Sequence, residues 1–231
     1  AGRARIINQP LGVVGIIVPW NYPLFLAVSP LAAALAAGNR VMIKMSEFTP
    51  RTGELLAELA GRYFSAEEVS VLLGDASVGA DFARLPFDHL LFTGSTRVGH
   101  DIMRMAAENL TPVTLELGGK SPVILGPGYP LEKAAERIMV GKMLNAGQTC
   151  IAPDYVLVPA GREQAFVEAA RAVVARCFPA MATTPDYTSI INERHYQRLQ
   201  GYLGDAQQRG ARIVPLSTAS ADATDRRLPP L

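Results

Sequence analysis

Short runs rich in valine and isoleucine alternate with helix-forming stretches along most of this chain, and this rhythm constrains its fold more than any other feature. A strand is expected at 12–18, a helix over 31–37 that ends at Gly38, and a second strand at 41–44. Strand–helix–strand units of this kind pack around a parallel sheet, because a helical crossover joins parallel strands. The sequence therefore predicts an α/β fold with a Rossmann-like parallel sheet.

The alternation continues toward the end of the chain. A helix should begin at Pro50 with Thr49 as its N-cap, because proline suits the first helical turn. Ser65–Glu68 has the form of a capping box, but a strand pattern follows it directly, so a turn is expected there. The further expected strands are 69–73, 89–92, 113–117, 155–158 and 212–214, and the further helices cover 98–106, 131–145, 162–178 and 193–208.

The pair Gly118-Gly119 follows the expected strand 113–117 and marks a domain boundary. Glycine permits tight or left-handed turns that other residues avoid. We therefore expect one domain over 1–117 and a second over 118–231. The chain opens inside a strand pattern and closes in a polar tail, so both domains are expected to be incomplete.

Composition argues against several function classes. The 231 residues are 49% hydrophobic and 19% charged, which suffices for a sizeable buried core. A net charge of +1 gives no basic footprint for nucleic acid or for an anionic membrane surface. No apolar run reaches the roughly 18 residues of a membrane span.

Cysteine and histidine are sparse. Cys150 and Cys177 form neither a disulfide framework nor a Cys-x-x-Cys motif, which fits a reducing compartment and favours the cytoplasm. His89, His100 and His195 lack the spacing of a ligand set, so no metal site is expected.

Cys150 is the first candidate for chemistry. An intracellular cysteine is often a small buried hydrophobe. Residues 147–149, however, form no apolar face and follow a helix, where a loop can present a thiol. Cys177 instead falls at helical spacing from Phe166 and Val173, and we expect it in the core.

Glu116 is the candidate partner of that thiol. A thiolate is a strong nucleophile, and a carboxylate can serve as general base on a thiol or on a water. Glu116 stands between Leu115 and Leu117, and burial there would make its carboxylate a stronger base, as general-base catalysis near neutrality needs. A solvated carboxylate at the end of a strand is the alternative.

The segment 94–99, Gly-Ser-Thr-Arg-Val-Gly, is a candidate phosphate site. It joins a strand to a helix, so free backbone N–H groups and the helix dipole could hold an anion. It matches neither G-x-G-x-x-G nor G-x-x-x-x-G-K-[ST], because His100 follows Gly99. A plain strand-to-helix turn is the alternative.

Two further polar positions follow expected strands. Prolines at 19 and 23 bracket Asn21 and would hold its carboxamide rigidly as an oxyanion donor, unless it is a turn asparagine bonded to its own backbone. Lys44, with Glu47 three residues on, could bind ribose hydroxyls, although a surface ion pair is the common alternative.

Taken together, these segments resemble the aldehyde dehydrogenase superfamily. The resemblance rests on five motifs in order: P-W-N-Y-P at 19–23, K-M-S-E at 44–47, F-T-G-S-T-x-x-G at 92–99, E-L-G-G-K-S-P at 116–122 and G-Q-T-C at 147–150. Residues 151–155 are similar to the class 3 branch, and 186–196 to its bacterial members that act on coniferyl aldehyde.

The resemblance implies roles for the candidate residues. Cys150 would be the nucleophile, Glu116 the base, and Asn21 with the Cys150 backbone N–H the oxyanion hole. The first domain would bind NAD(P) and the second would carry the nucleophile. The implied contacts to the cofactor are Lys44 and Glu47 on the adenosine ribose, Gly94 and Ser95 on the pyrophosphate, Val98 on the adenine, and Trp20, Phe92, Thr93 and Leu117 along the cleft.

The implied reaction oxidises a small-molecule aldehyde, an aromatic one such as coniferyl aldehyde, to a carboxylic acid through a Cys150 thiohemiacetal and thioester. Glu47 favours NAD, although class 3 relatives often accept NADP as well, and the resemblance implies a homodimer. Two alternatives stay open at this point: a CoA-acylating aldehyde dehydrogenase, against which Glu116 argues, and a nucleotide-binding fragment without turnover.

Overall fold

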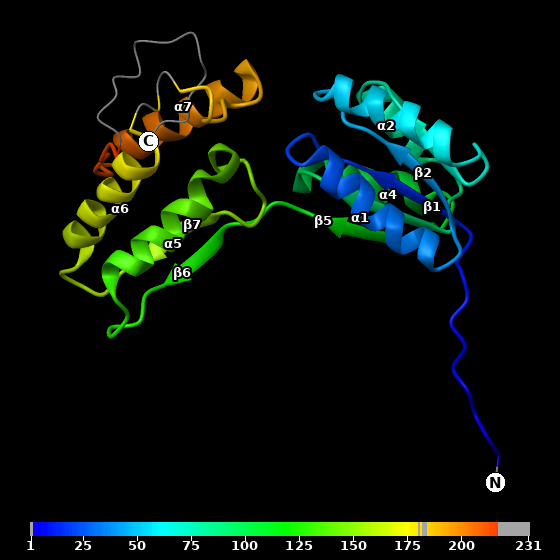
Figure 1. The fold of residues 1–231 in the computed structure, drawn as a ribbon, viewed down its shortest axis with the longest axis horizontal. Helices are drawn as coiled ribbons and strands as arrows, with labels where there is room; N and C mark the ends of the chain where they lie inside the picture. The colour runs from blue at the N-terminus through cyan, green and yellow to red at the C-terminus, as the bar shows by residue number, and fades with distance from the viewer. Residues whose placement is uncertain (1, 180, 182–183, 217–231) are drawn as a thin grey trace. The chain divides into compact units, whose positions relative to one another are not determined.

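The computed structural model describes residues 2–179, 181 and 184–216, and Figure 1 shows its elements. The chain divides into two compact units, Ala1–Gly118 and Gly119–Leu231, one residue beyond the expected boundary. Neither Gly118 nor Gly119 has a positive φ, so the boundary contains no left-handed turn at these glycines.

Within residues 2–118, the structure describes a five-stranded parallel sheet. Its strand order is β3-β2-β1-β4-β5. The strands are β1 (Val13–Ile17), β2 (Arg40–Lys44), β3 (Val69–Leu72), β4 (His89–Thr93) and β5 (Val113–Glu116). The expected α/β fold with a parallel sheet is thereby confirmed.

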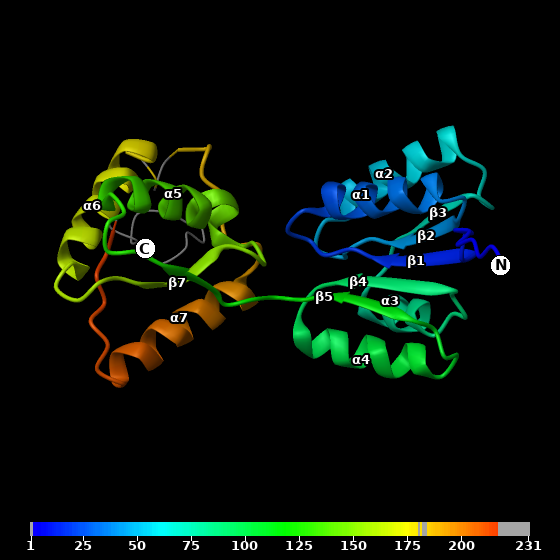
Figure 2. The ribbon, with the colours of Figure 1, turned by 90° about the horizontal axis from the view of Figure 1, so that it is seen from below.

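Helices cover both faces of this sheet. Figure 2 shows α1 (Pro23–Ala36) and α2 (Pro50–Tyr63) over one face, and α3 (Ala76–Ala83) and α4 (Thr96–Ala107) over the other. The chain runs outward from β1 to β3 and then returns to β4 on the other side of β1. Such a reversal of strand order opens a crevice at the carboxyl ends of the two central strands, where open α/β sheets bind ligands.

Two hydrophobic clusters fill the layers of the first unit. One contains Ile16, Ile43 and Leu56, and the other contains Leu90, Phe92 and Ile102. Central strands buried on both faces read as continuous apolar runs rather than alternating ones, which is why their positions could be predicted from the sequence.

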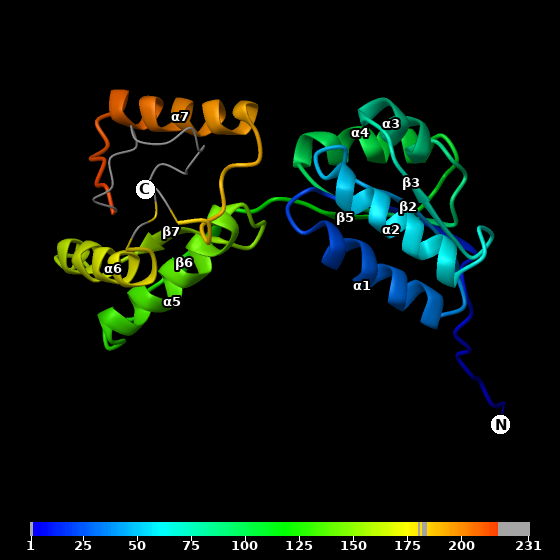
Figure 3. The same ribbon diagram turned by 45° about the horizontal axis from the view of Figure 1, so that its top comes forward.

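In the second unit, the described residues contain β6 (Ser121–Ile124) and β7 (Pro153–Leu157), which pair in parallel. Its helices are α5 (Leu131–Met143), the short 3-10 helix η1 (Leu144–Gly147), α6 (Glu163–Cys177) and α7 (Glu193–Gln208). Helices α5 and α6 pack side by side (Figure 3). Their shared cluster is rich in methionine and includes Met139, Met143, Val173 and Val174.

Two expectations about elements were wrong, and two elements, α3 and β6, were not expected. Residues 212–214 form no strand; Arg171 Nε instead donates to the Pro215 carbonyl at 2.9 Å. The helix expected over 31–37 begins much earlier, at Pro23. Helix α3 was not expected; the Asp75 carboxylate caps it by accepting from Ser77 N at 2.9 Å.

Candidate functional site

The carboxyl edge of the five-stranded sheet collects most of the residues singled out in the first unit. Ile17 of β1 pairs with Lys44 and with Phe92, and Thr93 of β4 pairs with Glu116. The loops that continue from this edge carry Trp20, Asn21, Glu47, Gly94, Ser95 and Leu117. The parallel register thus brings together positions up to about a hundred residues apart in the sequence.

The N-terminus of α4 lies at this edge. Ser95 is its N-cap, and the Ser95 Oγ accepts a hydrogen bond from Val98 N at 3.3 Å. The first turn holds no acidic residue and contains Arg97. The other N–H groups of a first helical turn lack intrahelical acceptors, so this end suits an anion such as a phosphate.

Glycine is required on both sides of that turn. A Cβ at Gly94 would lie 2.4 Å from Phe92 Cζ, and a Cβ at Gly99 would lie 2.8 Å from Leu117 Cδ2. Both glycines therefore allow the backbone to lie directly against the side chains of β4 and the segment after β5.

Lys44, at the end of β2, is buried, with 3% of its surface exposed. Its Nζ donates to the Met45 carbonyl at 2.7 Å, and it makes no ion pair with any residue that the structure describes. Burial lowers the Lys44 pKa, and the nearby charges of Glu47 and Asp75 oppose that shift. The surface ion pair that was the common alternative is therefore excluded.

The free N–H donors of the Lys44 ammonium suit the hydroxyl groups of a ribose. An ammonium has three N–H donors, and among the described residues Lys44 uses one of them on Met45. Thr49 is the N-cap of α2 as expected, but its side chain makes no capping hydrogen bond. Thr49 Oγ1 is buried and has no hydrogen-bond partner among the described residues. Ribose hydroxyls accept hydrogen bonds, so they could take the remaining Lys44 donors.

Glu116 is exposed, so it is not the buried carboxylate but the alternative, a solvated carboxylate at the end of a strand. It ends β5, an edge strand paired only with β4 in the described sheet. Side chains alternate along a strand, so Val113 and Leu115 pack on the cluster of Phe92 while Glu116 points to the other face. The sequence neighbours of Glu116 are thus apolar without burying its carboxylate.

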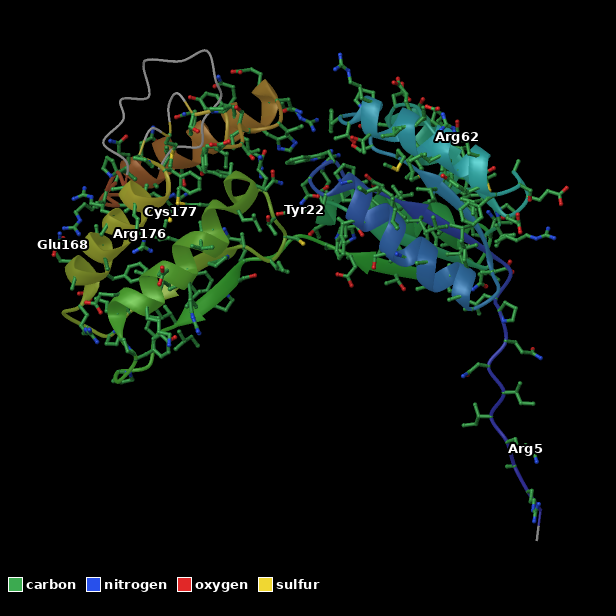
Figure 4. The ribbon with its side chains drawn as sticks, viewed as in Figure 1. Arg5, Tyr22, Arg62, Glu168, Arg176 and Cys177 are labelled. Carbon is green, nitrogen blue, oxygen red and sulfur yellow. The ribbon has the colours of Figure 1, made fainter. Side chains whose placement is uncertain are left out.

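Trp20 and Asn21 lie in the short loop between β1 and α1 and are half-buried. The start of that loop is tied to β2, because Val18 N donates to the Lys44 carbonyl at 3.0 Å. Its end is set by Tyr22, the N-cap residue of α1 (Figure 4), and by Pro23 in the first turn. Two fixed ends restrict where the Asn21 carboxamide can point.

Cys150 belongs to the second unit, where it is exposed and carries a free thiol. The loop before it has an uncommon backbone: Asn145, Ala146 and Gly147 have φ of 52°, 56° and 74°. A left-handed conformation costs a non-glycine residue roughly 1–2 kcal/mol. The surrounding structure must hold such a loop in place.

Two contacts that the sequence did not reveal hold the Cys150 loop. The Gln148 side chain donates to the Ser189 carbonyl and accepts from Ile191 N. Gly119 touches the loop as well, since a Cβ there would lie 3.1 Å from the Cys150 carbonyl oxygen. Neither partner could be inferred from spacing, because both are more than 25 residues from the loop.

Cys177 is exposed, so the expectation that it lies in the core was wrong. It is the last residue of α6 (Figure 4), and the buried residues of that helix are Ala170, Val173 and Val174. Phe178 closes the cluster beyond the helix end instead, with its ring 4.8 Å from that of Tyr187. The apolar spacing was real, but the packed surface ends one turn before Cys177.

No cluster of three or more histidine, cysteine or acidic side chains that could hold a metal ion occurs among the described residues. In the part of the chain that the structure describes, no helix combines the length and the apolar character needed to cross a bilayer.

Comparison with known protein families gives a match over nearly the whole chain. The model described as "Aldehyde dehydrogenase family" matches residues 2–228. Among curated proteins, the chain is 62% identical over 226 residues to a probable coniferyl aldehyde dehydrogenase of Pseudomonas aeruginosa, covering 98% of the chain and 47% of that protein. It is 54% identical over 223 residues to the coniferyl aldehyde dehydrogenase of a Pseudomonas species, covering 96% and 46%.

Solved structures similar to this chain include aldehyde dehydrogenases. The substrate-bound AldH of Staphylococcus aureus superposes with a TM-score of 0.83 at 38% identity, over 94% of this chain and 50% of that one. An aldehyde dehydrogenase of Mycobacterium tuberculosis complexed with NAD+ gives 0.81 at 35% identity, over 92% and 45%. The chain thus spans about half the length of the relatives that it matches.

Proposed function

The chain belongs to the aldehyde dehydrogenase family, and on that premise we propose that the protein carrying it oxidises an aldehyde to a carboxylic acid with NAD as cofactor. The observation that carries the proposal is the carboxyl edge of the sheet, where Lys44, the Gly94-Ser95 turn and Glu116 meet in one register. A dinucleotide site and a carboxylate at one sheet edge suit a dehydrogenase.

In this proposal, NAD is held by residues of the first unit. The N-terminus of α4, with Gly94 and Ser95, takes the pyrophosphate, and Val98 lies against the adenine. Lys44 and Glu47 take the adenosine ribose. The residues proposed to line the cleft are Trp20, Phe92, Thr93 and Leu117. The exposed Glu47 carboxylate would repel a 2′-phosphate, which favours NAD, with NADP the weaker cofactor.

Cys150 is the proposed nucleophile. Its thiolate attacks the aldehyde carbon, and the Asn21 carboxamide with the Cys150 backbone N–H donates hydrogen bonds to the oxyanion of the thiohemiacetal. Bound NAD supplies the acceptor for the hydride. Glu116 then takes a proton from a water, which hydrolyses the thioester to the acid. Loss of the Asn21 donor should lower turnover on the order of 100-fold.

The proposed substrate is an aromatic aldehyde such as coniferyl aldehyde, because the relatives with 52–62% identity carry that name. A homodimer in the cytoplasm completes the proposal. The cytoplasmic location is supported by the need of a catalytic thiol for a reducing compartment. Sedimentation of the purified protein measures its oligomeric state.

The test is NADH formation from coniferyl aldehyde by the protein that carries this chain. Cys150→Ala should abolish turnover, while Cys177→Ala, which changes the other exposed thiol, should leave it at the wild-type rate. Calorimetry with NAD should give the same affinity for Cys150→Ala and for the wild type. Normal turnover of Cys150→Ala would contradict the scheme. If the wild type binds NAD but forms no NADH from any aldehyde, the nucleotide-binding alternative is supported.

The same assay separates hydrolysis from transfer to CoA. Hydrolysis requires a base on water, so Glu116→Gln should slow release of the acid strongly. Acyl-CoA as the main product, together with a harmless Glu116→Gln change, would favour the CoA-acylating alternative.

A further inference from the structure

Gln148, two residues before Cys150, joins the nucleophile loop to a distant segment of the same unit. Its Nε2 donates to the Ser189 carbonyl at 3.2 Å, and its Oε1 accepts from Ile191 N at 2.9 Å. The carbonyl and N–H of residues two apart on one edge are the groups that a neighbouring β-strand would pair. The Gln148 carboxamide therefore pairs with residues 189–191 as a peptide group of an added strand would.

The segment that receives Gln148 is itself fixed. Ile190 is buried, with 1% of its surface exposed, and Tyr187 is 2% exposed. Directly after the segment, Asn192 caps α7, because its Oδ1 accepts from His195 N at 3.0 Å. Residues 187–192 are thus anchored by their own packing and capping, so the bonds from Gln148 tie the loop to a firm support.

The loop depends on that support. Asn145 and Ala146 both have the left-handed conformation that side chains other than glycine disfavour. Gln148 acts on this stretch too, because its Nε2 donates to the Asn145 carbonyl at 3.1 Å. The same carboxamide therefore fixes the bend before Cys150 and attaches that bend to residues 189–191.

We propose that Gln148 is a positioning residue for Cys150: by bracing the loop, it sets how the thiol is presented and how fast it reacts. The inference rests on the proposed function only for the identity of the aldehyde reaction, because thiol reactivity is measurable without substrate. A loop released from residues 189–191 would sample conformations that turn the thiol away. Misplacement of a reacting group by 1 Å can cost on the order of 100-fold in rate.

Two substitutions distinguish the roles of the amide oxygen and the amide nitrogen of Gln148. Gln148→Met keeps the length of the side chain but removes every donor and acceptor. Gln148→Glu keeps an acceptor for Ile191 N and loses the N–H donors to Asn145 and Ser189. We expect Gln148→Glu to be at least as severe as Gln148→Met, because its second carboxylate oxygen would face the Asn145 and Ser189 carbonyl oxygens. Gln164→Met, at an exposed glutamine of α6, is the matched control.

The measurement is the alkylation rate of Cys150 by iodoacetamide as a function of pH, mapped by mass spectrometry in the protein that carries this chain. Cys177 is an internal reference, because it is an exposed free thiol of the same unit. In Gln148→Met, the Cys150 to Cys177 rate ratio should fall about tenfold or more, with kcat falling on the order of 100-fold at an unchanged KM. Gln148→Glu should lower the ratio at least as far.

If Gln148→Met keeps the wild-type ratio of the Cys150 and Cys177 alkylation rates, the proposal is overturned. The proposal would also be overturned if, in Gln148→Met, the alkylation rates of Cys150 and Cys177 change by the same factor and the melting temperature drops. That pattern indicates a general loss of structure. If the wild type forms no NADH from any aldehyde, the proposed function fails. The alkylation ratio still decides the role of Gln148 in that case.

Discussion

The backbone N–H of Gly94 donates a hydrogen bond to the backbone carbonyl of Glu116, at 3.0 Å. This bond continues the ladder between β4 and β5, in which Thr93 pairs with Glu116. It connects the proposed pyrophosphate turn to the proposed general base. A change that moves the turn should therefore also disturb the end of β5.

Gly94→Ala tests how tightly that turn is packed. The new Cβ would lie 2.4 Å from Phe92 Cζ, so a ring buried in the core must move. Overpacking of a core typically costs about 1–3 kcal/mol. We expect a loss of unfolding free energy in that range, measured by urea denaturation, and weaker NAD binding by calorimetry.

Gly79→Ala is the control for the Gly94 change. Gly79 lies inside α3, where an added Cβ meets no atom within 4 Å. Alanine is a better helix former than glycine, so this variant should gain roughly 0.5–1 kcal/mol. Equal stability changes in the two variants would contradict the packing argument.

Lys44 predicts a dependence of stability on pH. Desolvation lowers its pKa in the folded state below the 10.5 of an exposed lysine. Between the folded and unfolded pKa values, the unfolded chain binds more protons, so the free energy of unfolding rises with pH there. Its burial is thus unfavourable at neutral pH, and that cost disappears as the pH approaches 10.5.

Lys44→Met removes this titration while keeping the length of the side chain. The unfolding free energy of the wild type minus that of Lys44→Met should rise with pH from neutrality toward 10.5, as followed by urea denaturation. Lys133→Met, at an exposed lysine of α5, is the control. A flat difference for Lys44→Met would show that its ammonium is solvated in the folded state.

The parallel sheet could be predicted from the sequence because its strands are continuous apolar runs between helices. Two strand predictions failed. In β6, Pro122 lacks an N–H and the register shifts beside it, so the segment carries a weak strand signal. The opposite error occurred at residues 212–214, where a strand was predicted from β-propensity. No strand pairs with them among the described residues.

The positions of the site residues followed from motifs, whereas their environments depended on tertiary packing. The exposure of Glu116 depends on β5 being an edge strand, which local sequence does not encode. The burial of Lys44 depends on strands on both sides of β2. The role of Gln148 depends on partners 41 and 43 residues away.

Leu110 offers a test of backbone strain away from the site. It has a φ of 57° and is 89% exposed, so its left-handed conformation is strained and little burial of the side chain offsets that strain. Leu110→Gly should raise the unfolding free energy by about 1 kcal/mol. Leu55→Gly, at an exposed position inside α2, should lower it by about 1 kcal/mol. Changes of the same sign in both variants would contradict a strained Leu110.

Gly119 and Gly118 form a matched pair for the Cys150 loop. A Cβ at Gly119 would lie 3.1 Å from the Cys150 carbonyl oxygen, whereas a Cβ at Gly118 would meet no atom within 4 Å. Neither glycine has a positive φ, so alanine is compatible with both backbones. Alanine also restricts the unfolded chain, which stabilises by roughly 0.4–1 kcal/mol and offsets part of the crowding at Gly119.

Gly119→Ala should therefore change reactivity more than stability. The carbonyl must move by a few tenths of an ångström, and the peptide that carries the Cys150 side chain moves with it. We expect the alkylation rate of Cys150 relative to Cys177 to fall about tenfold, with unfolding free energy within about 1 kcal/mol of the wild type. Gly118→Ala should keep the wild-type ratio. If both alanine variants keep that ratio, the contact between Gly119 and Cys150 has no influence on the thiol.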